Sequence, residues 1–193
     1  MKALVFFFFI LMISSCGVQY RLPKNGGSST DTSHVYTLPY PAGVAHFMIQ
    51  GYNSFFSHKG RLNLDFKMRK GSPIAAARNG VVVRVVERFK RGGVHIKFLS
   101  QANQVIVQHD DGTQAMYGHL QYNGALVSVG DTVQVGQVIA KAGSTGYSAI
   151  SHLHFYVWRF GSAGREVIPT RFYTGKGIKY LRPGRWYRAR KRI

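Results

Sequence analysis

The chain has 193 residues, and its 26 Lys and Arg against 7 Asp and Glu give a formal net charge of +19. This length leaves room for one domain with a substantial core and excludes several large domains. The only cysteine is Cys16, which excludes a fold held together by disulfides within the chain, while the excess of cations favours a polyanionic neighbour.

The first 15 residues are typical of an export signal. Lys2 is followed by an almost unbroken apolar run over residues 3–13, which is too short to span a bilayer as an ordinary helix. The run ends in Ile-Ser-Ser-Cys-Gly, which resembles the bacterial lipobox, whose cysteine is acylated and becomes the mature N-terminus. We therefore predict a lipoprotein signal peptide at 1–15 and a membrane anchor on Cys16.

The residue after Cys16 bears on location. It is Gly17 rather than an Asp, which resembles the pattern that Gram-negative bacteria sort to the outer membrane. The same anchor in a Gram-positive source would hold the protein on the outer face of the cytoplasmic membrane. The expected location is the cell envelope, facing the periplasm if the source is Gram-negative.

Residues 16–35 are rich in Gly, Ser, Thr and Asn, which predicts a flexible tether. From residue 36 onward short β-branched or aromatic segments alternate with turn signals such as Asp111-Gly112 and Asn123-Gly124, and no long window has helical periodicity. We expect an all-β domain of antiparallel sheets, resembling a barrel or sandwich, over 36–164, with only short helical turns. Its strands are expected at 80–86, 94–98, 104–109, 114–120, 137–140 and 154–158, with a hairpin at 110–113.

Residues 165–193 form a predicted basic C-terminal extension, with ten Lys or Arg against the single acid Glu166. A solvated basic tail and a surface that binds anionic envelope polymers both explain this composition. Nucleic acid is not the expected partner, because an exported lipoprotein rarely meets it.

The most informative motif is His152-Leu153-His154. In an extended strand both imidazoles point to one face and Leu153 points to the other, so the two rings could serve one metal site. A hydrolytic zinc site needs three protein ligands and one open position. His58 and Asp65 offer two ligands ahead of the predicted strands, and one histidine of the pair would be the third.

At this point the chain resembles a family, the lysostaphin-type (LytM-domain) zinc endopeptidases of bacterial cell walls. The resemblance covers about residues 50–160 and rests on four blocks in a fixed order. These blocks are residues 58–66 (His to Asp-Phe), 71–82 (Gly-Ser-Pro-Ile-Ala-Ala-Ala-Arg-Asn-Gly-Val-Val), 105–120 (ending Tyr-Gly-His-Leu) and 130–155 (ending His-Leu-His-Phe).

The resemblance implies that His58, Asp65 and His154 ligate Zn²⁺, with His119 and His152 as two histidines beside the metal that do not ligate it. One of the two would transfer protons and the other would donate to the developing oxyanion, and the sequence does not assign these roles between them. One departure is the spacing: six residues separate His58 from Asp65, against three in the commoner family form.

Three further residues have alternative interpretations. His46 is the rival first ligand, 19 residues before Asp65. Tyr52 is either an oxyanion donor or, as we prefer, a packing tyrosine. For His109 we favour a partly exposed turn histidine or a partner of a ligand over a direct catalytic role.

The leading hypothesis for function is a lipid-anchored zinc endopeptidase that hydrolyses peptide bonds in peptidoglycan stems or cross-links. The alternative is a non-catalytic LytM-type module that binds peptidoglycan or activates an amidase. Modules of that kind typically lack one or more of the five site residues, and all five residue types are present here.

Overall fold

The computed structural model describes residues 34–191. The predicted signal peptide, Cys16 and almost all of the predicted tether lie outside the described residues, so the lipid anchor stays a prediction. No helix within 34–191 has the length and apolar character needed to cross a membrane.

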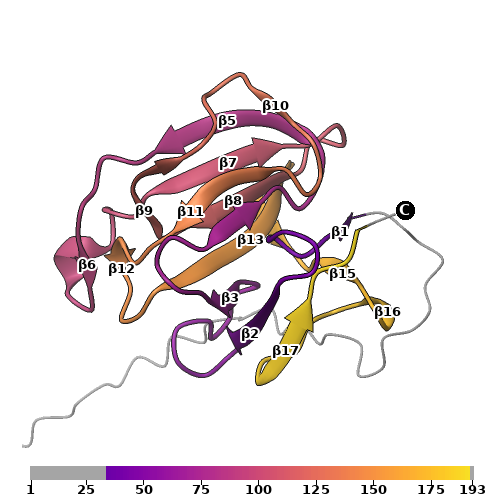
Figure 1. Ribbon diagram of the computed structural model, residues 1–193, viewed down its shortest axis with the longest axis horizontal. Helices are drawn as coiled ribbons and strands as arrows, with labels where there is room; N and C mark the ends of the chain where they lie inside the picture. Colours follow the sequence, from indigo (N-terminus) through magenta and orange to yellow (C-terminus); the bar gives the residue numbers. More distant parts are fainter. Residues whose placement is uncertain (1–33, 192–193) are drawn as a thin grey trace, which may run out of the picture.

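One large antiparallel sheet of nine strands organises the protein (Figure 1). Eight of its strands form a continuous path, and β14 (Gly164–Ile168) joins the sheet by pairing with β13. In spatial order the path is β10 (Thr132–Val133), β5 (Gly80–Val86), β7 (Gln104–Gln108), β8 (Gln114–Gly118), β13 (His152–Gly161), β3 (Leu64–Lys67), β2 (Ala45–Gln50) and β17 (Arg185–Arg188).

A second antiparallel sheet lies against one face of the large sheet (Figure 1). It consists of β4 (Pro73–Ala75), β11 (Val138–Ala142) and β9 (Leu120–Ala125). Side chains of both sheets belong to one buried cluster, in which Ile74 and Ile139 join Tyr117 and Phe155. The all-β, antiparallel, single-domain fold expected from the sequence is confirmed.

Smaller pairings complete the fold. One three-stranded sheet contains β1 (Val35–Tyr36), β15 (Arg171–Thr174) and β16 (Gly177–Lys179), and a parallel pair joins β6 (Gly92–Gly93) to β12 (Gly146–Tyr147). Within residues 34–191 the only helical element is the short 3₁₀ helix η1 (Ile96–Phe98).

Strand β13 fixes the position of the predicted histidine pair. Leu153, Phe155 and Val157 are fully buried in the core, while His152, His154 and their neighbours at every second position face the other way. Burying a side chain as large as Phe155 contributes about 2–3 kcal/mol, so a one-residue slip that exposed this row would be strongly disfavoured. Core packing therefore holds both imidazoles on the open face of the sheet.

Most of the predicted strands are confirmed, and the hairpin at 110–113 joins β7 to β8 with Gln108 opposite Gln114. The strand predicted at 94–98 is wrong. These residues form a turn and η1, and Val94 and Ile96 are 67% and 74% exposed, so their alternation marks no buried face. The side chain of His95 accepts a hydrogen bond from the amide of Lys97, which favours the turn over an extended strand.

Two further expectations need correction. The strand predicted at 114–120 is interrupted at His119, whose φ is +61°, so β8 ends before it and β9 begins after it. The turn predicted at Asn123-Gly124 lies inside β9, where Asn123 absorbs a bend through its own positive φ of +49°.

The basic segment 165–193 is structured up to Lys191 and contains parts of two sheets. Strand β17 pairs with β2, and β15 pairs with β1. Its basic residues flank aromatic ones, as in Arg185-Trp186-Tyr187-Arg188, and the high proportion of basic residues made the strand difficult to recognise in the sequence. Within the described residues this segment is folded onto the domain and is no free tail.

A polar network holds the hairpin at 110–113 against the rest of the fold. Arg78 forms ion pairs with Asp110 (2.7 Å) and Asp111 (2.5 Å). Asp111 also accepts hydrogen bonds from the amide (3.0 Å) and hydroxyl (2.6 Å) of Thr113, and that hydroxyl lies 2.9 Å from the hydroxyl of buried Tyr36. Burial raises the pKa of Asp111, but the hydrogen bonds from Thr113 and Arg78 outweigh it and hold that pKa well below its ordinary value.

We expect Asp111→Asn to lower the free energy of unfolding by about 1 kcal/mol at pH 7, because Asn forms weaker bonds to the same partners. A lowered pKa in the folded state means that this stabilisation is complete above about pH 4 and is lost as the pH falls further. Urea unfolding at pH 7 and at pH 2.5 measures the difference between the two proteins, which should shrink at the lower pH. Asp110→Asn is the matched control, because that side chain is 87% exposed and should cost little at either pH. An equal loss from both substitutions would contradict this account.

Candidate metal centre

Three potential metal ligands converge where β3 and β13 pair. Asp65 on β3 lies directly opposite His154 on β13, and His58 approaches from the loop before β3. The Nε2 atom of His58 is 3.2 Å from one carboxylate oxygen of Asp65, and the Nδ1 atom of His154 is 2.7 Å from the other. One ligand atom from each residue lies within 4.8 Å of the others. The three residues predicted as ligands therefore do come together in the folded chain.

The six residues between His58 and Asp65 are accommodated by a compact loop. The amide of Asn53 donates to the carbonyl of Arg61 (3.1 Å), so the two arms of the loop are tied together. Gly60, with φ of +71°, allows the sharp return of the chain. The longer spacing therefore still places His58 beside the carboxylate.

Gln50 is part of this arrangement and was missed from the sequence. It lies opposite Asp65 where β2 pairs with β3, and its amide donates to Asp65 Oδ2 at 2.8 Å. The same amide group bonds Ser57, next to His58. Gln50 therefore orients the carboxylate and the loop together, a role that only the strand register reveals.

Backbone carbonyls set the tautomers of three imidazoles. The Nδ1 atoms of His58, His119 and His152 lie 3.2, 2.7 and 2.8 Å from the carbonyl oxygens of Gly51, Thr145 and Ile150. A carbonyl only accepts, so Nδ1 carries the hydrogen and Nε2 keeps its lone pair in the neutral ring. Each of these rings therefore presents a free lone pair at Nε2.

The residues fit a bound cation. His58 Nε2 is buried without a hydrogen-bond partner among the described residues, and it faces a carboxylate oxygen. Two acceptors facing each other in a buried site are unfavourable unless a positive charge lies near both. Imidazole and carboxylate ligands suit Zn²⁺ among the common metals.

Asp65 supplies the negative charge of the centre. Its side chain is 3% exposed, and burial alone would raise the pKa of its carboxyl group. The contacts with His154 and His58 outweigh burial and hold that pKa well below the ordinary range. Asp65 is therefore ionised at neutral pH, ready to balance the charge of a cation.

His119 and His152 lie beside this group. Their ring centroids are 4.6 Å apart, and His152 Nε2 is 3.7 Å from Asp65. Burial, with the neighbouring histidines, lowers the pKa of His119 to about 3, and burial also lowers the pKa of His152. Both rings are neutral at pH 7, the state in which an imidazole can accept a proton.

A second set of nitrogen atoms, from His119, His152 and His154, also lies within 4.8 Å. It consists of three imidazole nitrogen atoms and lacks a carboxylate. The group with Asp65 adds a negative charge that balances part of the charge of a divalent cation, and we treat it as the candidate metal centre.

Asn103 and Thr145 support the backbone at His119, whose φ is positive, and neither role was predicted from the sequence. The hydroxyl of Thr145 donates to Leu120 O (2.7 Å) and accepts from the amide of Asn103 (3.0 Å). The fully buried side chain of Asn103 bonds both backbone groups of Phe89 and lies 3.2 Å from the carbonyl of Gln121. Thr145 lies in the Gly-Ser-Thr-Gly run, which gave some signal, whereas Asn103 gave none.

The remaining candidate residues lie elsewhere. His46 packs edge-on against Tyr40 and belongs to neither group of potential ligands in the described chain. The hydroxyl of Tyr52 bonds both the amide and the carbonyl of Thr170, in agreement with a packing role. His109 is buried, with its Nδ1 2.6 Å from Asn79 O, so the expectation of a partly exposed histidine is wrong.

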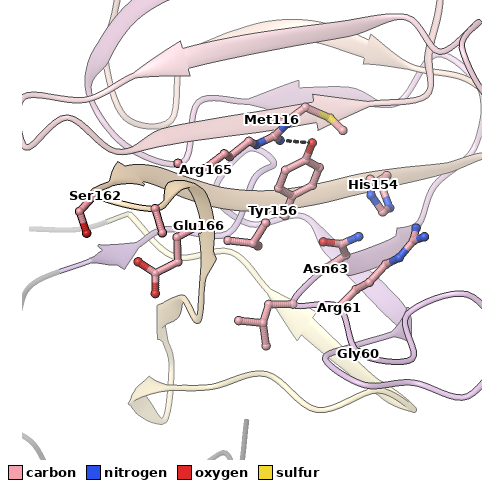
Figure 2. Close-up of a pocket in the computed structure, with 14 residues that line it drawn as sticks. Gly60, Arg61, Asn63, Met116, His154, Tyr156, Ser162, Arg165 and Glu166 are labelled. Carbon is pink, nitrogen blue, oxygen red and sulfur yellow. Dashed lines mark hydrogen bonds between the residues drawn. The ribbon is translucent and has the colours of Figure 1, made fainter. Parts of the chain in front are cut away.

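A cavity of about 930 Å³ opens beside the candidate metal centre (Figure 2). His154, Tyr156 and Met116 reach it from the open face of the large sheet. The loop that carries His58 contributes Arg61 and Asn63, and the hairpin between β13 and β14 contributes another wall. The cavity is large enough for several residues of an extended peptide.

An antiparallel β-fold with two imidazoles and a carboxylate around one point, two more histidines beside them and an adjoining cavity is typical of metal-dependent hydrolases. Residues 57–168 match the sequence model of Peptidase family M23, and the chain belongs to this family.

Named relatives agree with this assignment. The chain is 35% identical over 119 residues to lysostaphin of Staphylococcus simulans, a match that covers 61% of this chain and 19% of that protein. It is 36% identical over 118 residues to the glycyl-glycine endopeptidase ALE-1 of Staphylococcus capitis, covering 61% and 26%. The chain thus spans about a fifth to a quarter of the length of these relatives.

A solved structure supports the fold alone. It is the catalytic domain of the prophage-encoded M23 protein EnpA from Enterococcus faecalis, crystallised as an A109H mutant. The TM-score is 0.51 at 24% identity, over 67% of this chain and 93% of that chain.

Proposed function

We propose that the protein is a zinc-dependent endopeptidase that hydrolyses peptide bonds in peptidoglycan stems or cross-links. The observation that carries this proposal is the convergence of His58, Asp65 and His154, with His119 and His152 beside them, next to an open cavity. A module that only binds the wall would not need a buried carboxylate facing an unpartnered imidazole nitrogen.

His58, Asp65 and His154 would hold the zinc ion, which when bound acidifies water to a pKa of about 7 and polarises the scissile carbonyl. His152 is suited to accept the proton of the attacking water, because its ring is neutral and its Nε2 lies 3.7 Å from ionised Asp65. That carboxylate stabilises the positive charge that His152 acquires. The proton then passes to the leaving amine.

His119 faces His152 across the site and has a deeply buried neutral ring. Its Nδ1–H group donates a hydrogen bond to the carbonyl oxygen of Thr145, which fixes the orientation of the ring. We assign it the orientation of water and substrate at its free Nε2 atom, a task that requires neutrality and a fixed position.

We also propose a location in the cell envelope, through a lipid on Cys16, where peptidoglycan is within reach. The net charge of +19 supports contact with anionic envelope polymers as well. Metabolic labelling with a clickable fatty acid tests the anchor: Cys16→Ser should abolish the label.

Digestion of isolated wall sacculi of known chemistry tests the enzymatic proposal. We expect the zinc-loaded protein to release muropeptides whose masses identify a cleaved peptide bond, and a chelator to stop their release until zinc is restored. Release that is equal with chelator present would contradict the metal mechanism. Bound zinc with no release from any wall type would favour the non-catalytic module.

A further inference from the structure

The cavity beside His154 has a cationic lining. Of the ionisable groups that line it, Arg61 and Arg165 are positive and Glu166 is negative. Glu166 accepts a hydrogen bond from Arg159 at 3.1 Å, an arginine that does not line the cavity. Glu166 is therefore paired with Arg159, and no ion pair joins either cavity arginine to an acid within the described residues.

Arg165 is held in place by aromatic side chains rather than by a carboxylate. Its guanidinium lies 4.2 Å from the ring centre of Trp158 and donates to the hydroxyl of Tyr156 at 2.5 Å. Trp158 is on the open face of β13, yet it is only 3% exposed, which fits a ring covered by this guanidinium. One hydrogen bond leaves most of the five N–H donors of Arg165 free, in a fixed position.

Arg61 approaches from the opposite wall. Its amide donates to His58 O (2.8 Å) and its carbonyl accepts from Asn53, so its backbone is anchored in the loop that carries the candidate ligand. Figure 2 shows its guanidinium beside Asn63, on the side of the cavity where His154 lies. No ion pair of Arg61 occurs within residues 34–191.

We infer that this cavity binds a carboxylate of the substrate at Arg165, with Arg61 as a further cation on the opposite wall. The inference rests on the proposed function, since the same cavity opens at His154 and would receive the peptide next to the bond that is cut. The ligand class is a peptide with a free side-chain carboxylate close to the scissile bond. A bridge made of glycine residues has no such group and would leave both guanidinium groups unsatisfied.

The general charge of the protein would attract any anion, so the test must separate a built site from nonspecific attraction. Two forms of a peptidoglycan stem tetrapeptide serve as probes, one with free side-chain carboxylates and one with these converted to carboxamides. Trp186→Phe leaves Trp158 as the only tryptophan, and its fluorescence reports a ligand at Arg165. His152→Ala in the same protein slows turnover, so that little ligand is cleaved during the titration.

We expect the acid form to bind at least tenfold more tightly than the amide form, the factor that one charge-assisted hydrogen bond provides. Arg165→Gln should remove this preference and leave affinity for the amide form unchanged, whereas Arg165→Lys should keep part of it. Arg84→Gln is the matched control, because it removes one exposed cation of β5 outside the cavity and leaves the pair between Arg159 and Glu166 intact. It should retain the preference.

Equal affinity for the two forms, or an equal loss in Arg84→Gln and Arg165→Gln, would overturn the inference. Thermal unfolding of each variant shows that the comparison is made on folded protein. The binding result is independent of hydrolysis. A preference for the acid form without any wall cleavage would therefore support the carboxylate site and contradict the endopeptidase proposal. Wall cleavage without this preference would support the endopeptidase proposal and contradict the carboxylate site.

Discussion

Replacing Asp65 with Asn is expected to reduce bound zinc from about one ion per chain to less than a tenth and to lower wall hydrolysis at least about 1,000-fold. The carboxylate is the single anion of the candidate centre, and its contacts with His58 and His154 keep it ionised. An amide of the same shape keeps the packing but loses the charge. Elemental analysis after dialysis against micromolar zinc measures the first effect, and muropeptide release measures the second.

The fold should survive this substitution. Asp65 is buried, and its lowered pKa means that the ionised form stabilises the fold, so the amide should lower the thermal stability without abolishing folding; thermal unfolding measures this loss. Asp131→Asn is the matched control: it replaces an exposed carboxylate that caps a turn by accepting from the amide of Ser128. Normal zinc content in Asp65→Asn would contradict the proposed centre. If that variant fails to fold, His154→Ala provides the same test.

The strand that carries the histidine pair could be predicted because its pattern is local. Alternation of apolar and polar residues over 153–157 fixes which side chains enter the core, whatever the partner strands are. The same reasoning fails at 94–98, where the pattern is equally good but the segment pairs with no strand in the described chain. Alternation predicts a strand only when the fold supplies a neighbour and a core to cover one face.

The prediction that His58 lies close to Asp65 depended on the family resemblance. Six intervening residues can take many conformations, and the contact exists because Asn53 and Arg61 close the loop. Gln50 orients the carboxylate through a strand register, and no local signal reveals a register. The role of such a residue depends on contacts between segments far apart in the sequence, and these contacts leave no local pattern from which to predict it.

The position of Arg165 could not be predicted from the sequence either. In the sequence it opens a run of basic residues and resembles the start of a solvated tail. In the fold, β14 turns back along β13 and places its guanidinium over Trp158, seven residues earlier in the chain. Composition predicted a basic surface, whereas the hairpin decides that one of its charges faces the cavity.

His152→Ala and His119→Ala are expected to keep bound zinc and lose about 100- to 10,000-fold in the rate of wall hydrolysis. Both rings lie beside the candidate ligands without being needed to hold the ion. The loss should be larger for His152, because its position near Asp65 favours the protonated state that follows proton transfer. His95→Ala, at an exposed turn, is the control and should change neither quantity.

The pH dependence provides a further readout of His152. Burial lowers its pKa below the ordinary 6.5, so the neutral, proton-accepting form persists to lower pH than in a free imidazole. The acidic limb of the pH profile of kcat/KM should therefore lie below pH 6.5 and be absent from the residual activity of His152→Ala.

The zinc content of these variants distinguishes the two possible groups of metal ligands. If either histidine variant loses its metal while Asp65→Asn keeps it, the ion is held by His119, His152 and His154, and the water that attacks the peptide must be activated by some other group.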